Sequence, residues 1–249
     1  MKNFWKRFKI MLKLFFAKPI PDEDLLFLFE QNDLDLLGKI SLSPENEVLL
    51  LNFNSFDLFK WYLNKHSLRE PAQFALLDNE EFFRYFVGLK KLEHNVECEF
   101  IKRNNENLIC YYLEMHGLNY SSEVIMLDNC SRNVIVSFIR MHEFGPLALT
   151  NLVNSGNEAL IRTYIDWHDL RWKTAQLALI DGKNEKLIKY YICRHELADD
   201  AEVALVNIQN EELLKLYIER HKLSRSAKIA ILETGNVRLF EVYSTFKHD

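Results

Sequence analysis

Hydrophobic positions follow one pattern that recurs along the chain in steps of 24 to 27 residues. Each copy carries apolar residues at i, i+1, i+4 and i+5, which places them on one face of an α-helix. In one copy these residues are Leu213, Leu214, Tyr217 and Ile218. A fixed period of about 20–50 residues is typical of tandem repeats that stack into a solenoid. Eight copies begin at Asn or Ser: Ser55, Asn79, Asn105, Ser131, Asn157, Asn184, Asn210 and Asn236.

The part of each repeat that precedes this helix predicts a shorter partner, so each repeat holds a helix A followed by a helix B. Within one copy, Ala201 and Leu205 give helix A an apolar face, and Asp199 or Asp200 is expected as its N-cap. Asn210 is expected to cap helix B. Isolated helices of about ten residues are marginal in water, so each must bury its apolar face against the neighbouring repeat.

Paired short helices resemble the α-solenoid group that includes HEAT, TPR and leucine-rich-variant arrays. The 26-residue period is shorter than the TPR or HEAT unit, and neither the TPR Trp-Leu-Gly-Tyr pattern nor the ankyrin TPLH motif occurs. The resemblance implies an all-α superhelix of about eight two-helix repeats and assigns no functional residue. We expect a repeat domain at 21–249, with a degenerate first repeat at 21–42, behind an N-terminal amphipathic capping helix at 1–20.

The first twenty residues have two interpretations, and both start from an apolar stripe at helical spacing. Lys9 and Lys13 interrupt the stripe, and no small-x-small cleavage site follows it, which argues against a signal peptide. A capping helix would turn the stripe toward the open end of the stack, and we favour it because a solenoid needs covered ends. Alternatively, the basic residues opposite the stripe would seat the helix on an anionic membrane. The stripe comprises Phe4, Phe8, Met11, Leu12 and Phe15.

Composition narrows the class of protein without adding a function. Hydrophobic content of 48% and a charged fraction of 27% are ordinary for a folded domain, and seven Gly and five Pro are few. The net charge of −5 argues mildly against bulk binding of nucleic acid. The four cysteines lie far apart with no C-x-x-C pair, so we expect free thiols and a cytoplasmic location.

Two positions of the repeat are filled almost uniformly, and we interpret both as structural. One is aromatic in every copy and is expected to form the core between B helices: Tyr62, Phe86, Tyr112, Phe138, Tyr164, Tyr191, Tyr217 and Tyr243. The other is histidine in six copies, with lysine in two: His66, Lys90, His116, His142, His168, His195, His221 and Lys247. Histidine there would suit a metal ladder or a pH sensor. Lysine favours a structural role instead, because it suits the C-terminal end of a helix dipole.

An enzyme needs a constellation of residues that occurs once, and the sequence offers none. It has no Gly-rich phosphate loop and no H-E-x-x-H, G-x-S-x-G or D-x-D-x-D-G motif. Most carboxylates fall at helix starts or on outward faces, and Glu99 within a helix A is the exception. We therefore expect no catalysis, no metal site and no cofactor.

The outward columns of helix B are the most suggestive for binding, because they combine basic with large apolar side chains. One column holds Lys65, Leu89, Met115, Met141, Trp167, Arg194, Arg220 and Phe246. Aromatic and arginine anchors of this kind bind protein segments, so we expect a protein-binding scaffold or adaptor whose partner is another protein or a peptide. The candidate residues are Trp61, Tyr85, Tyr111, Arg162, Trp167, Lys189, Tyr190, Arg194 and Arg220.

Three alternatives stay open at this point. The same columns would suit a nucleic-acid-binding solenoid, with bases stacked on the aromatic rings. Acidic neighbours such as Glu114 and Asp166 weaken that alternative. A membrane-peripheral adaptor held by the basic N-terminal helix is less expected still. The columns would also fit an ordinary solvated face of a helix.

Overall fold

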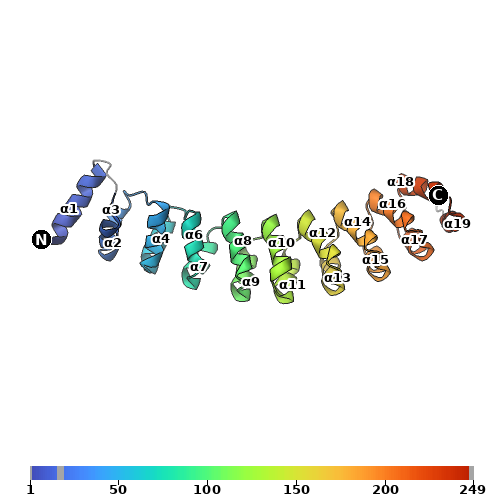
Figure 1. Ribbon diagram of the computed structural model, residues 1–249, viewed down its shortest axis with the longest axis horizontal. Coiled ribbons are helices and arrows are strands. Elements are labelled where there is room, and N and C mark those ends of the chain that lie inside the picture. Colours follow the sequence, from blue (N-terminus) through green and yellow to red (C-terminus); the bar gives the residue numbers. More distant parts are fainter. Residues whose placement is uncertain (1, 16–19, 247–249) are drawn as a thin grey trace. The chain divides into compact units, whose positions relative to one another are not determined.

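The computed structural model describes residues 2–15 and 20–246 (Figure 1). Lys247, the last position of the histidine column, lies outside these ranges. Throughout the described ranges the regular structure is helical, with no strand, as the period predicted. The chain divides into two compact units, residues 1–100 and 101–249, and each is described by itself.

The first unit contains α1 (Lys2–Phe15), α2 (Asp22–Glu30), α3 (Leu34–Leu37), α4 (Pro44–Asn52), α5 (Phe56–Leu63), α6 (Glu70–Leu76), α7 (Glu80–Val87) and most of α8 (His94–Lys102). The second contains α9 (Glu106–Met115), α10 (Tyr120–Asn129), α11 (Arg132–Met141), α12 (Pro146–Asn154), α13 (Glu158–Trp167), α14 (Lys173–Asp181), α15 (Glu185–Ile192), α16 (Asp199–Asn207), α17 (Glu211–Ile218), α18 (Arg225–Glu233) and α19 (Val237–Thr245).

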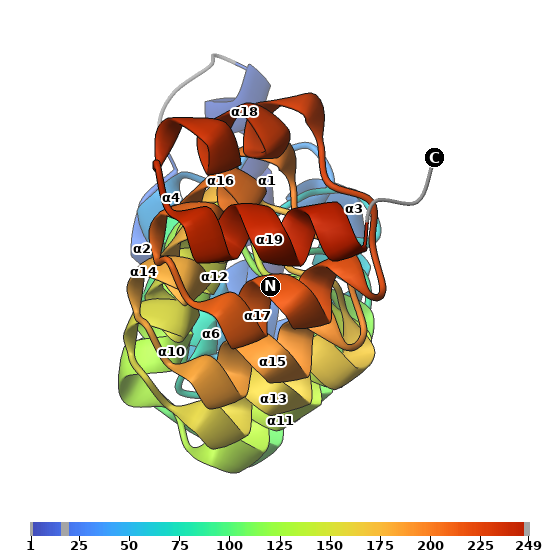
Figure 2. The ribbon, with the colours of Figure 1, turned by 90° about the vertical axis from the view of Figure 1, so that its right-hand side faces the viewer.

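Helices of one kind contact the next helix of the same kind. In the second unit each A helix contacts the next one, in the order α10, α12, α14, α16 and α18. The B helices do the same in the order α9, α11, α13, α15, α17 and α19. Figure 2 shows α11, α13, α15 and α17 following one another on one side. In the first unit α4 contacts α6 and α5 contacts α7. This sequential contact is the arrangement expected of a helical repeat array.

Side-chain caps start most B helices at the predicted residue. The Asn210 carboxamide accepts the Leu213 N–H at 3.1 Å, and five other B helices begin with an Asn cap of the same kind. The predicted cap at Asp199 or Asp200 is wrong: the N-cap of α16 is Ala198. The Gln176 side chain already accepts the Ala198 N–H, and Asp199 begins the helix, where its charge favours the dipole.

The aromatic column forms the core between B helices, as predicted. Its members from Tyr62 to Tyr217 are buried in both units. Tyr243 is half-buried, because within the described residues no further helix pair covers α19.

A second buried column, which is polar, was missed in the sequence. It lies in the A helices and comprises Glu47, Gln73, Glu97, Glu123, Gln176 and Glu202, all at most 4% exposed. Glu99, which the sequence analysis singled out, is only half-buried. Buried carboxylates are costly unless hydrogen bonds satisfy them, so their partners matter.

These buried side chains link each repeat to the next. Glu202 accepts the Tyr217 hydroxyl from its own repeat at 2.7 Å and the Ser224 N–H, at the start of the next A helix, also at 2.7 Å. Glu47 does the same with the Tyr62 hydroxyl and the Arg69 N–H. Gln73, Glu123 and Gln176 likewise accept a backbone N–H at the start of the following A helix, where backbone donors have no partner within the helix.

The histidine rings form a further link between repeats. Each of four rings places Nε2 within 3.0 Å of a carbonyl oxygen of the preceding B helix; the pairs are His142 with Leu113, His168 with Ile139, His195 with Ile165 and His221 with Ile192. Since a carbonyl only accepts, Nε2 carries the proton. Lys90 donates instead to the carbonyl of His66, which follows the end of α5. These contacts support the structural interpretation of the column at the five positions where they occur, one of which is a lysine.

The N-terminal helix α1 forms where it was predicted but is turned the other way. The stripe expected to face inward, from Phe4 to Phe15, is exposed, whereas Ile10 on the opposite face is fully buried. Lys13 on that opposite face and Arg7 at the border of the stripe hold α1 to the next helices, because each meets an aspartate at 2.6 Å. Whether α1 caps a stack stays a prediction.

Candidate protein-interaction surface

The two predicted site residues of the first unit are partly packed rather than free. Trp61 on α5 is half-buried, lies against the backbone at Gly38, and has the Lys65 ammonium 4.9 Å from its ring centroid. Tyr85 on α7 is half-buried beside Phe56, with ring centroids 5.5 Å apart. Both rings therefore contribute mainly to the packing between neighbouring helices.

In the second unit, Tyr190 gathers two of the predicted arginines. The Arg194 guanidinium lies 3.7 Å from the Tyr190 ring centroid and that of Arg162 lies 4.8 Å from it. The Tyr190 hydroxyl donates to Asp166, which also pairs with Arg194 at 3.3 Å. The hydrogen bond to Asp166 raises the pKa of Tyr190 above its ordinary value. The charges of Arg194 and Asp166 are therefore paired within the cluster, whereas the buried Arg162 Nε has no hydrogen-bond partner among the described residues.

Two of the basic residues in and beside this cluster form ion pairs with glutamates. Lys189 on α15 contacts Glu212 on α17 at 2.9 Å, and Arg162 contacts Glu158 at 2.7 Å. The hydrogen bond from Lys189 lowers the pKa of Glu212 below its ordinary value and raises the pKa of Lys189. Exposed pairs of this kind contribute little to stability, but they remove positive potential from the surface.

The most accessible part of the predicted surface is an apolar edge on successive B helices. Met115 on α9, Met141 on α11 and Trp167 on α13 end their helices at equivalent positions, with exposed fractions of 50%, 42% and 57%. Because α9, α11 and α13 contact one another in turn, the three side chains follow one another along this face. The same position is occupied by Arg194 and Arg220 after α15 and α17, and both are exposed.

A shallow hollow of about 360 Å³ lies on α11 just before Met141. Its lining includes Val136 and Ser137, at the positions where α15 has Lys189 and Tyr190. Arg132 and Arg140 lie at its rim, are exposed, and have no ion-pair partner among the described residues. Small residues in the helix face thus leave room, and the two arginines supply unpaired charge.

We name the hollow together with the apolar edge the α11 surface: Met115, Arg132, Val136, Ser137, Arg140, Met141 and Trp167. Of these, only Trp167 was predicted from the sequence as a site residue. Met115 and Met141 share its column but were not predicted. The sequence signal for the hollow was that Val136 and Ser137 are smaller than the residues at the same positions of most other copies. Tyr111 on α9 is half-buried beside this surface.

The described residues hold no group of three or more His, Cys, Asp or Glu side chains arranged to bind a metal ion. The four cysteines are free thiols, as predicted, and burial raises the pKa of Cys130 to about 11. No family model, no curated protein and no solved structure matches this chain.

Proposed function

We propose that this chain is an α-solenoid superhelix of about eight two-helix repeats that serves as a non-enzymatic protein-binding scaffold. The period of the sequence and the contacts between successive helices support the architecture. The exposed apolar edge beside two unpaired arginines on α11 carries the function. The cytoplasmic location stays a prediction.

The α11 surface suits an extended protein segment. Methionine adapts to irregular apolar side chains, and tryptophan and arginine are the commonest anchors of protein interfaces. Arg132 and Arg140 suit acidic side chains, so the expected partner segment combines apolar with acidic residues. The internal pairing of Lys189, Arg162 and Arg194 weighs against tracking of a nucleic-acid backbone, which depends on unpaired cations.

Site-specific crosslinking tests this function. A photoreactive residue at position 141 should capture a defined protein, whereas the same residue at the exposed Leu147 on α12 should not. Met141→Asp and Trp167→Ala should each weaken binding of the captured protein about ten-fold or more while leaving the melting temperature unchanged. Equal capture from both positions would contradict the proposal, as would binding that Met141→Asp leaves intact.

A matched measurement separates protein from nucleic acid. Retention on heparin or mixed oligonucleotides that falls steeply with salt, and falls again in Arg132→Ala/Arg140→Ala, would favour a nucleic-acid ligand. We expect no such retention.

A further inference from the structure

Helix α1 presents a continuous apolar face outward. Phe4, Trp5, Phe8, Met11 and Leu12 recur at helical spacing and have exposed fractions between 38% and 67%. Large contiguous apolar patches are uncommon on the surfaces of soluble proteins and mark sites of interaction. This face is therefore a candidate docking surface separate from the α11 surface.

The packing of α1 fixes this orientation. On the opposite side Ile10 is fully buried and the Lys13 ammonium lies 2.6 Å from Asp24, while at the border of the apolar face the Arg7 guanidinium lies 2.6 Å from Asp33. Both aspartate side chains are at most 15% exposed, so these pairs are better shielded from water than ordinary surface pairs. The helix is thus held by its polar side.

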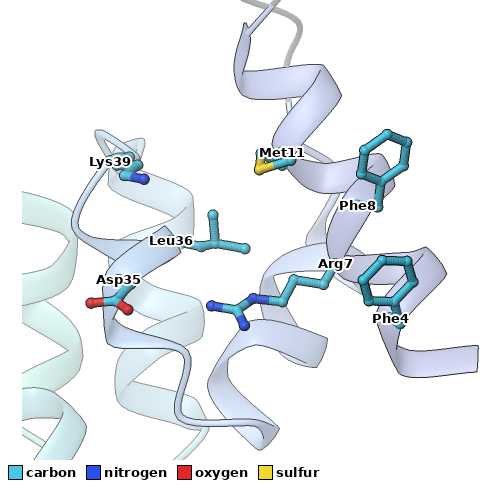
Figure 3. A pocket seen from close by; sticks show the side chains of 7 residues that line it. All are labelled: Phe4, Arg7, Phe8, Met11, Asp35, Leu36 and Lys39. Atoms are coloured by element: carbon cyan, nitrogen blue, oxygen red, sulfur yellow. The ribbon is translucent and has the colours of Figure 1, made fainter. Parts of the chain in front are cut away.

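Figure 3 shows how the apolar face meets the rest of the unit. A pocket of about 410 Å³ opens between α1 and α3. In this view the Arg7 guanidinium extends toward α3, whereas the Phe4 and Phe8 rings lie on the far side of α1. Phe4, Phe8 and Met11 are among the residues that line this pocket, so part of the apolar face borders α3 while its side chains stay open to solvent.

Charge indicates what the face contacts. Residues 1–20 contain six basic side chains and no acidic one, although the whole chain carries a net charge of −5. In an α-helix, Arg7 lies one turn from Met11 on one border of the apolar face, and Lys9 lies one turn from Trp5 on the other. An apolar face with Trp and Phe, bordered by basic residues, is the pattern of helices that lie in a membrane interface.

We propose that α1 binds the surface of a bilayer containing anionic lipids, with its axis in the membrane plane. Within the described residues no helix is both long and apolar enough to span a bilayer, which fits a helix that lies on the surface. The sequence alone favoured a cap because a solenoid needs covered ends, and a cap would turn the stripe inward; the exposed stripe favours the membrane alternative instead.

Vesicle co-sedimentation of the full chain tests the proposal. The wild-type chain should sediment with vesicles of phosphatidylcholine and phosphatidylglycerol, and more weakly with phosphatidylcholine alone. Phe8→Asp/Leu12→Asp should lower the partition at least about ten-fold. The matched control, Ile229→Asp/Leu232→Asp on α18, adds the same charge at exposed apolar positions and should leave the partition unchanged.

Two further readouts identify the contact. Lys9→Glu should weaken binding to the anionic vesicles but not to the neutral ones. In a chain with Phe at Trp61, Trp167 and Trp172, the fluorescence of Trp5 should shift to the blue on addition of anionic vesicles. Circular dichroism of each variant controls for folding.

Three outcomes would overturn the proposal: no sedimentation with anionic vesicles, unchanged sedimentation of the Phe8/Leu12 variant, or a dimer in sedimentation velocity that depends on Phe8 and Leu12. The last outcome would assign the face to a second copy of the chain. None of them affects the α11 surface, whose test uses other residues.

Discussion

Two repeats of the second unit use the same positions in different ways. In the α16–α17 repeat, Glu202 satisfies the Tyr217 hydroxyl and the N-terminus of α18. In the α12–α13 repeat, Leu149 takes the place of the carboxylate, and the buried Tyr164 hydroxyl has no hydrogen-bond partner among the described residues. The Trp172 indole donates instead to the Phe144 carbonyl at 3.2 Å.

The difference shows what the buried polar column does. Both repeats bury their aromatic side chain, so apolar packing does not require a carboxylate. The carboxylate adds a specific link to the start of the next repeat, and the α12–α13 repeat replaces that link with an indole. This repeat carries Trp167, at the edge of the α11 surface.

The largest effect is expected when the buried glutamate of the α16–α17 repeat is replaced by the leucine of the α12–α13 repeat. Glu202→Leu would leave the buried Tyr217 hydroxyl and Ser224 N–H without their acceptor. We expect a loss of about 2–4 kcal/mol in the free energy of unfolding, measured with urea, and faster amide exchange in α16 to α18. Glu202→Gln, which imitates Gln176, is the control and should cost less. Equal losses of unfolding free energy in Glu202→Leu and Glu202→Gln would show that these hydrogen bonds do not contribute to stability.

Alkaline pH should lower the free energy of unfolding through the buried tyrosines. Burial, followed by the hydrogen bond to Glu202, raises the pKa of Tyr217 well above its ordinary value of 10. Above pH 10 the unfolded chain loses this proton while the folded chain keeps it. The contribution of Tyr217 to the free energy of unfolding is therefore fully present below pH 10 and is lost as the pH rises. Each such tyrosine contributes a slope of about 1.4 kcal/mol per pH unit. Tyr217→Phe should make the slope shallower by that amount, and an unchanged slope would contradict the prediction.

The smallest effect, and the only stabilising one, is expected at Tyr164. Tyr164→Phe removes a buried hydroxyl that has no hydrogen-bond partner, so the free energy of unfolding should rise by about 0.5–1 kcal/mol. Tyr217→Phe at the same position of another repeat should instead cost about 1–2 kcal/mol, because it breaks a satisfied bond. Urea unfolding of the two variants side by side checks the opposite signs; a loss in both would erase the distinction between the repeats.

Much of the fold was readable from particular residues. The Asn caps, the aromatic core and the paired helices follow from local rules, since a side chain three residues from an N–H caps it wherever the helix lies. The candidate surface was only partly readable. Trp167 is exposed, but Trp61 and Tyr190 are half-buried, because outward positions on short stacked helices are covered by the neighbouring repeat to an extent that spacing does not reveal.

By itself the sequence determined the helices, their order and the residues between them, because periodicity and capping are properties of neighbours along the chain. Only the tertiary structure decided which polar side chains are buried, and which face of α1 points outward. Both depend on partners some 15 to 26 residues away, such as Tyr217 for Glu202 and Asp33 for Arg7. Desolvation and ion pairing are set by such partners, so no local pattern fixes them.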